Sequence, residues 1–387
     1  MQTAVRMKEI QPSATLALTA KAKELAGKGN PVISLAAGEP DFAVPAVARE
    51  ALIKALNDGF TRYTPTSGTP DLKEAVRAKL KLDQGLEADV SNIIISCGAK
   101  HSLYNLIQVL CEPGDEVILP RPYWVSYPEM IKLVGAKAVF VDTASTGFVM
   151  TADAIRKAVT PKTRLVILNS PSNPTGAVTP PAEVEKIARL LVENNLYAIS
   201  DEIYEYYVFD GQKHASVAQF MSNFLDHVAI VNGVSKSHAM TGLRIGYTIA
   251  HADVVKKIGV LQDHSTSNPA SLSQKAAAAA LGLGKDYKDN LRVTFEKKRD
   301  LMVELLTPIK KLKLFQPQGA FYVFMSVKDT GLTPEKFSNR LLDEKFVATI
   351  PGESFGAPDY VRLSYAASVD EIREGCKRIQ EWVGGLK

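Results

Sequence analysis

The chain has few cysteines and no long apolar run, and both scarcities narrow the class of protein. Its 387 residues include three cysteines, at positions 97, 111 and 376. An odd number without paired spacing predicts neither a disulfide framework nor a cysteine metal cluster. No stretch is apolar over the ~20 residues that span a bilayer, and residues 1–11 lack the apolar core of a secretory signal. We therefore expect a cytoplasmic protein that uses neither a membrane nor a bound metal.

The chain also lacks a strong excess of either charge. It has 46 basic and 42 acidic residues, a net charge of +4 that is spread out without a Lys/Arg block. A surface that binds nucleic acid or an anionic membrane needs concentrated positive charge, so neither partner is expected. With 46% apolar and 23% charged residues, the composition is typical of a globular enzyme. The length allows a large domain plus a smaller one.

The order of periodic segments predicts an α/β fold. From about residue 46 to 280, apolar strand-like runs alternate with amphipathic helices, which indicates a mostly parallel sheet covered by helices on both faces. From about residue 286 a charged helix, expected at 289–306, and several strands predict a smaller α+β unit; the strands are expected at 312–316, 320–325, 346–350 and 360–365. We predict an N-terminal arm and part of the small domain in 1–45, a large domain in 46–285 and a small domain in 286–387.

A lysine follows the apolar run at 228–231, which is the last strand predicted in the large domain. Lys236 lies beside Ser235, and Arg244 follows among small residues. Burial disfavours the ammonium form, and a neutral lysine can form a Schiff base with an aldehyde cofactor. A guanidinium group suits a phosphate. Taken alone, a lysine at this place is more often a surface residue at the end of a strand.

Small and polar residues follow other predicted strands. Gly98, Ala99 and Lys100 lie between a strand and a helix, where free N–H groups could hold a phosphate. Lys100 lies at the start of the predicted helix, where a positive charge is unfavourable to the helix dipole. An anion bound nearby would explain why a lysine occurs at this position. Asn173 lies in a turn fixed by prolines and could donate a hydrogen bond to a ring oxygen.

Further candidates have plain structural alternatives. Asp201 ends an apolar strand and could be a turn residue, or it could pair with a protonated ring nitrogen, while Tyr204 could reach the oxygen of the same ring. Taken alone, Trp124 would be a core residue. Three more residues have an ordinary structural interpretation when they are taken alone. Gly38 is a turn glycine and Tyr63 is an aromatic residue in a loop. Arg362 lies in a strand pattern, where an arginine normally points to water at the edge of a sheet.

Five short motifs occur along the chain. Each is weak evidence of function when taken alone, but all five in this order are highly specific. They are Gly-Glu-Pro-Asp-Phe at 38–42, Asn-Pro-Thr-Gly at 173–176, Asp-Glu-Ile-Tyr at 201–204, Ser-Lys at 235–236 with Arg244, and Arg362. The chain thereby resembles the class I aminotransferases, pyridoxal-phosphate enzymes of fold type I. The segments at 12–15, 123–128 and 240–242 (Pro-Ser-Ala-Thr, Tyr-Trp-Val-Ser-Tyr-Pro and Met-Thr-Gly) are closest to aspartate aminotransferase subgroup Ib.

The resemblance implies a role for each candidate. Pyridoxal phosphate would attach to Lys236, with Asp201 on the ring nitrogen, Asn173 and Tyr204 on the phenolate oxygen, and Trp124 stacked on the ring. The phosphate would be held by Gly98, Ala99, Lys100, Ser235, Arg244 and, from the partner subunit of a homodimer, Tyr63. The substrate would contact Gly38, Lys100, Trp124, Asn173 and Arg362, with Arg362 on the α-carboxylate and Lys100 on the distal one. One departure is Cys97 before Gly98, where the subgroup often has a second glycine.

The implied reaction is reversible amino transfer from L-aspartate to 2-oxoglutarate, giving oxaloacetate and L-glutamate. It would follow a ping-pong cycle between pyridoxal and pyridoxamine forms of the cofactor. Alternatives within the family are an aspartate/prephenate or aromatic aminotransferase, or a C–S lyase of the same cofactor class. A cofactor-binding transcription regulator would need a DNA-binding domain, for which the first 30 residues are too short.

Overall fold

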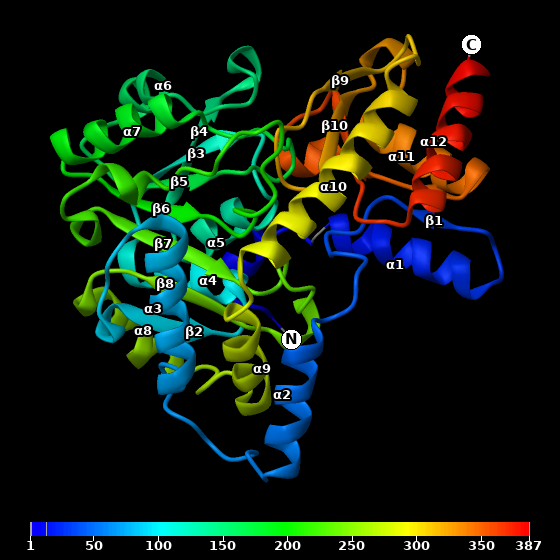
Figure 1. Ribbon diagram of the computed structural model, residues 1–387. Coiled ribbons are helices and arrows are strands. Elements are labelled where there is room, and N and C mark those ends of the chain that lie inside the picture. Colours follow the sequence, from blue (N-terminus) through cyan, green and yellow to red (C-terminus); the bar gives the residue numbers. More distant parts are fainter. Residues whose placement is uncertain (1, 13, 387) are drawn as a thin grey trace.

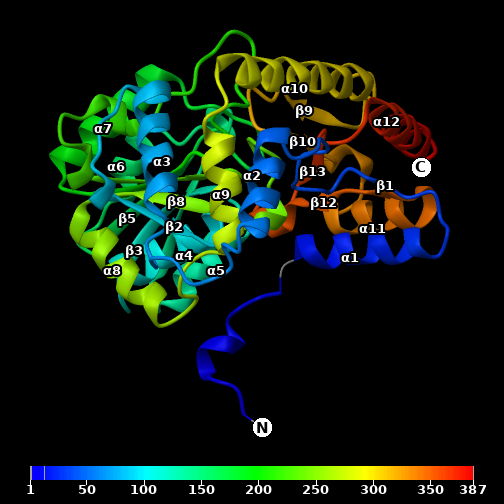
Figure 2. The ribbon, with the colours of Figure 1, turned by 60° about the horizontal axis from the view of Figure 1, so that its bottom comes forward.

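The chain folds around two β-sheets of different size, which lie in opposite halves of the view in Figure 1. The computed structural model describes residues 2–12 and 14–386. Among these residues, the helices are too short or too polar to cross a membrane. Figure 2 shows residues 2–12, with a short 3-10 helix at Val5–Lys8, extending away from the rest of the chain.

The large sheet has seven strands in the order β2-β8-β7-β6-β5-β3-β4. All neighbouring strands run parallel except those that pair with β8, which is antiparallel to both β2 and β7. The bounds of the strands are β2 Ile93–Ser96, β3 Glu116–Arg121, β4 Lys137–Asp142, β5 Thr163–Asn169, β6 Tyr197–Asp201, β7 Val228–Gly233 and β8 Gly246–Ile249. The sequence predicted a mostly parallel sheet, but β4 and β8 lie outside the strands that it predicted.

Helices cover both faces of this sheet because its strands are apolar on both sides. In β2, Ile93 and Ile95 join one core cluster and Ile94 the other, as the two-residue period of a strand requires. The first face is covered by α2 Ala46–Asn57, α3 Pro70–Gln84, α6 Ala152–Ala158, α7 Pro181–Glu193 and α9 Ser271–Leu281. The second face is covered by α4 Ala99–Leu110, α5 Ser126–Leu133 and α8 Ala252–Asp263.

The small sheet is antiparallel and has four strands in the order β12-β13-β10-β9. A separate parallel pair joins β1 to β11, so the start of the chain packs on its C-terminal part. The bounds are β1 Ile33–Ser34, β9 Lys313–Phe315, β10 Tyr322–Ser326, β11 Val347–Ala348, β12 Ile350–Pro351 and β13 Tyr360–Ser364. In Figure 2 these strands lie between α10 Lys285–Leu306 on one side and α1 Ala14–Gly27 with α11 Pro334–Lys345 on the other, and α12 Val369–Gly384 lies beside α10.

Two boundaries differ from the sequence-based prediction. The single strand expected at 346–350 is two short strands, because Val347–Ala348 pairs with β1 whereas Ile350–Pro351 pairs with β13. The helix expected from Asp289 begins at Lys285 instead. The division of the chain at residues 45 and 285 stays a prediction; the apolar cluster around the small sheet also takes in Ile203, Tyr207 and Phe209 from the predicted large domain.

Candidate active site

The carboxyl ends of three neighbouring parallel strands bring the central polar residues together. Asn169 ends β5 directly opposite Asp201, which ends β6, and Asp201 lies opposite Val231 of β7. Lys236 follows β7 within a short turn. Ligands in open α/β sheets bind at this edge, so a site here agrees with the topology.

A cavity of about 430 Å³ opens at this edge. Its volume lies in the range of small-molecule sites. Of the residues that the sequence predicted for the site, all line the cavity except Gly98 and Tyr63; those that do are Gly38, Ala99, Lys100, Trp124, Asn173, Asp201, Tyr204, Ser235, Lys236, Arg244 and Arg362. The cavity therefore joins residues from both sheets and from the loop after β1.

Lys236 lies inside this cavity and not at the surface. Its Nζ donates a hydrogen bond to the Gly38 carbonyl at 2.6 Å, and the Tyr207 hydroxyl donates to the Lys236 carbonyl at 2.7 Å. Burial lowers the pKa of Lys236 to about 8, and the positive charges of Arg244 and Arg362 act in the same direction. A lysine with this pKa loses its proton more readily than an exposed lysine does, so part of it is a neutral amine near physiological pH.

Asp201 is a buried carboxylate aimed at the same cavity. The Tyr127 hydroxyl donates to its Oδ2 at 2.6 Å, and the Ile203 N–H donates to its Oδ1 at 3.3 Å. Burial raises the pKa of Asp201 to about 6. A cationic ligand beside the carboxylate would favour its ionised form.

Arg362 occupies the centre of the small sheet. It lies in β13, between β12 and β10, and is only 4% exposed, so the alternative of an edge arginine pointing to water is wrong. Its Nη1 donates to Asn173 Oδ1 at 2.8 Å and its Nη2 to the Ala36 carbonyl at 3.0 Å. Its Nε is buried without a hydrogen-bond partner, and its guanidinium lies 4.3 Å from the Tyr322 ring centre.

Two tyrosines link Arg362 to the centre of the cavity. The hydroxyls of Tyr204 and Tyr322 share a hydrogen bond of 2.7 Å, and both side chains are buried. Burial raises the pKa of Tyr204 well above its usual range. Its phenol is therefore a permanent neutral hydrogen-bonding group.

The start of α4 and Arg244 also line the cavity. Gly98 has φ +89°, and a Cβ built on it would meet Arg244 Nη2 at 2.5 Å, so glycine is required for this approach. The N–H groups of Ala99 and Lys100, the first two of α4, have no partner inside the helix, as at any helix start. Lys100 Nζ lies 5.0 Å from the Trp124 ring centre, and this contact stabilises a cation where the helix dipole does not.

Two predicted site residues do not line the cavity, and one residue of a predicted motif lies outside the described residues. Tyr63 is 91% exposed and does not line the cavity. Gly98 supports the cavity through Arg244 without lining it. Ser13, part of the segment at 12–15, lies outside the described residues.

Sequence reasoning missed Tyr127, Asn169 and Tyr322 as lining residues. Tyr127 belongs to the segment at 123–128, and its place beside Trp124 was the one available signal. Asn169 follows a predicted strand, as the predicted residues do, and its side chain donates to the Asp201 carbonyl at 3.1 Å. Tyr322 lies in an apolar run, where an aromatic residue is normally part of the core.

The residues present fit pyridoxal phosphate. Lys100, Lys236, Arg244 and Arg362 give the cavity an excess of positive charge, which suits a phosphate and carboxylates. Asp201, Lys236 and the open start of α4 are the partners that a ring nitrogen, an aldehyde and a phosphate require. Arg362 Nε has no hydrogen-bond partner, so this N–H group is free to donate to a further acidic group.

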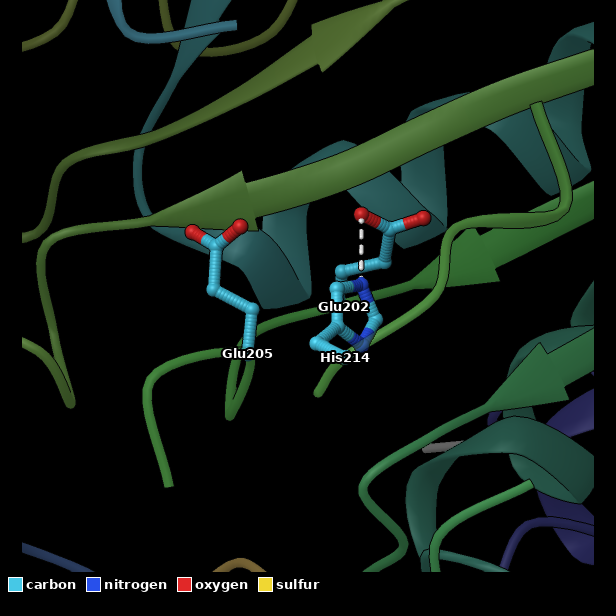
Figure 3. Close-up of side chains that lie close together, drawn as sticks. All are labelled: Glu202, Glu205 and His214. Atoms are coloured by element: carbon cyan, nitrogen blue, oxygen red, sulfur yellow. Dashed lines mark ion pairs between the residues drawn. The ribbon is translucent and has the colours of Figure 1, made fainter. Parts of the chain in front are cut away.

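A second polar cluster begins at Glu202, the residue that follows Asp201 at the end of β6. Figure 3 shows Glu202 paired with His214, at 3.2 Å, and Glu205 to one side. Their potential ligand atoms lie within 4.8 Å of one another. However, the carboxylates already accept from several side chains, which include Ser200, Ser216, Gln84, Asn232 and Lys79. Because the Lys79 ammonium lies 2.5 Å from Glu205, the cluster is a buried ion-pair network and not a favourable cation site.

This fold and the polar cavity at the sheet edge place the chain in a known class of enzymes. The chain belongs to the family of class I and II aminotransferases, whose sequence model matches residues 30–379. The predictions of fold type I and of an aminotransferase are thereby confirmed.

Individual relatives match over nearly the full chain. An aspartate aminotransferase of Bacillus sp. strain YM-2 is 45% identical over 384 residues, which is 98% of both chains. A probable aspartate/prephenate aminotransferase of Rickettsia bellii is 42% identical, again over 98% of both. The aspartate aminotransferase of Thermus thermophilus, solved with maleate, is 40% identical with a TM-score of 0.94 over 98% of this chain and 99% of that one. That of Rhizobium meliloti is 38% identical, with a TM-score of 0.94 over 100% of both chains.

Proposed function

We propose that the chain transfers the amino group of L-aspartate to 2-oxoglutarate with pyridoxal phosphate as cofactor. The observation that carries this proposal is the buried Lys236 amine, which lies in one cavity with Arg244, Arg362 and Lys100. One cation is available for the cofactor phosphate and two for the carboxylates of a dicarboxylic amino acid. The names of the relatives from Bacillus and Thermus support the same reaction. The cytoplasmic location stays a prediction.

Pyridoxal phosphate, when bound, supplies an aldehyde for the amino group and a ring that withdraws electrons from the reacting carbon. Ser235, Arg244 and the N–H groups at the start of α4 would hold its phosphate. Asp201 would hold the ring nitrogen in its protonated form, because a carboxylate stabilises an adjacent cation. Tyr204 and the Asn173 amide nitrogen would donate to the ring oxygen; Asn173 is oriented for this because Arg362 holds its amide oxygen.

Lys236 Nζ would act first as the cofactor's attachment point and then as the general base. Its pKa of about 8 allows the amine to take the α-proton of the amino acid and to return it to a neighbouring carbon. Arg362 would bind the α-carboxylate, so that the α-carbon lies between Arg362 and Lys236. Holding the reacting atoms in this way contributes several kcal/mol to lowering the barrier.

Lys100 would bind the distal carboxylate, so Lys100→Ala is expected to change substrate preference. We expect kcat/KM for L-aspartate to fall about 10- to 100-fold, the worth of a hydrogen bond to a charged group. The value for L-alanine, which has no distal carboxylate, should change only slightly. Steady-state assays with both amino acids measure the ratio of kcat/KM for L-aspartate to kcat/KM for L-alanine.

Lys23→Ala is the matched control, because Lys23 also lines the cavity but comes from α1. An unchanged preference for aspartate in Lys100→Ala would refute the role of Lys100. Loss of that preference in Lys23→Ala instead would assign the distal carboxylate to Lys23.

Prephenate is a second candidate acceptor. The Rickettsia relative is named as a probable aspartate/prephenate aminotransferase, and prephenate is also a dicarboxylate. The same cations could therefore hold it. Assaying prephenate beside 2-oxoglutarate as the acceptor separates the two activities.

We also propose a homodimer in which Tyr63 reaches the partner's cofactor phosphate. Tyr63 is 91% exposed in the single chain, and Ile53 and Leu56 of α2 are 49% and 51% exposed, which is unfavourable for an isolated subunit. Sedimentation analysis should give twice the chain mass of 42.1 kDa. A monomeric mass would contradict the role of Tyr63.

A further inference from the structure

Tyr127 contacts two candidate cofactor residues at once. It lies in the first turn of α5 and is 1% exposed. Its hydroxyl donates to Asp201 Oδ2 at 2.6 Å, and its ring packs edge-on against Trp124, with the ring centres 5.2 Å apart. The residue thus joins the carboxylate expected at the ring nitrogen to the indole expected on the ring face.

The hydroxyl of Tyr127 can act only as a hydrogen-bond donor to Asp201. Burial, together with the adjacent Asp201 charge, raises the pKa of Tyr127 well above its usual value, so the phenol keeps its proton. A donor that never ionises stabilises the carboxylate and cannot take its proton. Because the bond fixes one oxygen and the Ile203 N–H fixes the other, the carboxylate has one orientation.

We propose that Tyr127 is a positioning residue that keeps Asp201 ionised and aimed at the ring nitrogen of the cofactor. This inference rests on the proposed function, because it assumes that Asp201 meets that nitrogen. Without the phenol, burial would favour the neutral acid, and a neutral acid holds a protonated ring nitrogen less well. Tyr127 therefore acts through Asp201 and needs no contact with the substrate.

Other groups also influence Asp201, and they remain in place when the hydroxyl is removed. Glu202 disfavours the ionised form and Lys236 favours it, while the Ile203 N–H donates a hydrogen bond. The phenol of Tyr204 faces the same carboxylate. Tyr127→Phe removes only the donor from α5, so its effect isolates this one bond.

The test uses pyridoxamine 5′-phosphate, which carries the same ring but no aldehyde and so cannot attach to Lys236. Its affinity for the cofactor-free protein is measured by calorimetry in the parent, Tyr127→Phe and Tyr123→Phe. Tyr123 is the matched control because it precedes the same helix, yet its ring packs on Phe140. We expect Tyr127→Phe to weaken binding about tenfold to a hundredfold, the worth of a hydrogen bond to a charged group. Tyr123→Phe should bind nearly as the parent does.

Two further measurements separate this role from a structural one. In Tyr127→Phe, the fall in affinity on acidification should begin at higher pH, because Asp201 would be protonated more easily. In an Asp201→Ala background, Tyr127→Phe should cost little, because its partner is gone. A distorted site would instead lower the affinity by the same factor in both backgrounds, and that result would overturn the inference.

The outcomes also separate this inference from the proposed function. If the parent does not bind pyridoxamine phosphate, the proposed function fails. If the parent binds it and Asp201→Ala weakens binding, but Tyr127→Phe behaves like Tyr123→Phe, the inference alone is wrong.

Discussion

Replacing Lys236 with alanine is expected to abolish turnover of L-aspartate and leave a folded chain. The substitution removes both the attachment point of the cofactor and the base that moves the α-proton. Loss of a general base alone costs up to about 10⁴-fold, so we expect a fall of at least this size. The rate of oxaloacetate formation measures the loss, and circular dichroism measures the fold.

Two variants serve as controls for this prediction. Lys236→Arg keeps the positive charge but cannot supply a neutral amine, so it should be as inactive as the alanine variant. Lys285→Ala makes the same deletion at the start of α10, where the side chain is 84% exposed, and should retain full activity. If Lys236→Ala kept more than a tenth of the parent rate, the assignment of Lys236 would be wrong.

Replacing Arg362 with leucine is expected to give the second largest loss. Truncating one partner of a buried charged pair costs about 2–5 kcal/mol, which corresponds to a fall in kcat/KM of roughly 30- to 5,000-fold. The loss should be similar for aspartate and glutamate, because both present the same α-carboxylate. Steady-state kinetics with each amino acid measure it.

Arg362→Lys distinguishes charge from shape at this position. Lysine keeps the charge but lacks the planar fork that binds a carboxylate through two bonds, so an intermediate loss is expected. The affinity of Arg362→Leu for pyridoxamine phosphate should stay within a few-fold of the parent, because the cofactor phosphate is proposed to bind at Arg244 and the start of α4 and not at Arg362. Equal losses in cofactor affinity and in kcat/KM would mean that Arg362 supports the whole site and does not clamp the substrate.

The sequence predicts those parts of the fold that depend on local pattern. The run at 92–96 is apolar on both faces, so a buried strand could be predicted, and the break after it located the start of α4. The segment at 346–350 has an equally clear strand pattern, yet it divides between two sheets. That division depends on β1 and β13, which are distant in the chain, and local periodicity carries no information about such pairing.

The residues of the candidate site could also be predicted only where local sequence pattern is informative. Lys236 and Asp201 follow apolar strands, so their place at the sheet edge could be inferred from the residues. Arg362 could be assigned only by resemblance, because an arginine in a strand pattern normally indicates an exposed edge. Tyr127 and Tyr322 act through hydroxyl groups in otherwise apolar surroundings. Nothing in the sequence separates such hydroxyls from ordinary core tyrosines.

The central claim is that the chain performs a half-reaction with aspartate and a bound cofactor. The most direct test adds L-aspartate alone to the protein loaded with pyridoxal phosphate, without any 2-oxo acid. We expect one oxaloacetate per chain, together with loss of the cofactor's long-wavelength absorbance, which 2-oxoglutarate should then restore. An unchanged spectrum without oxaloacetate would contradict the account.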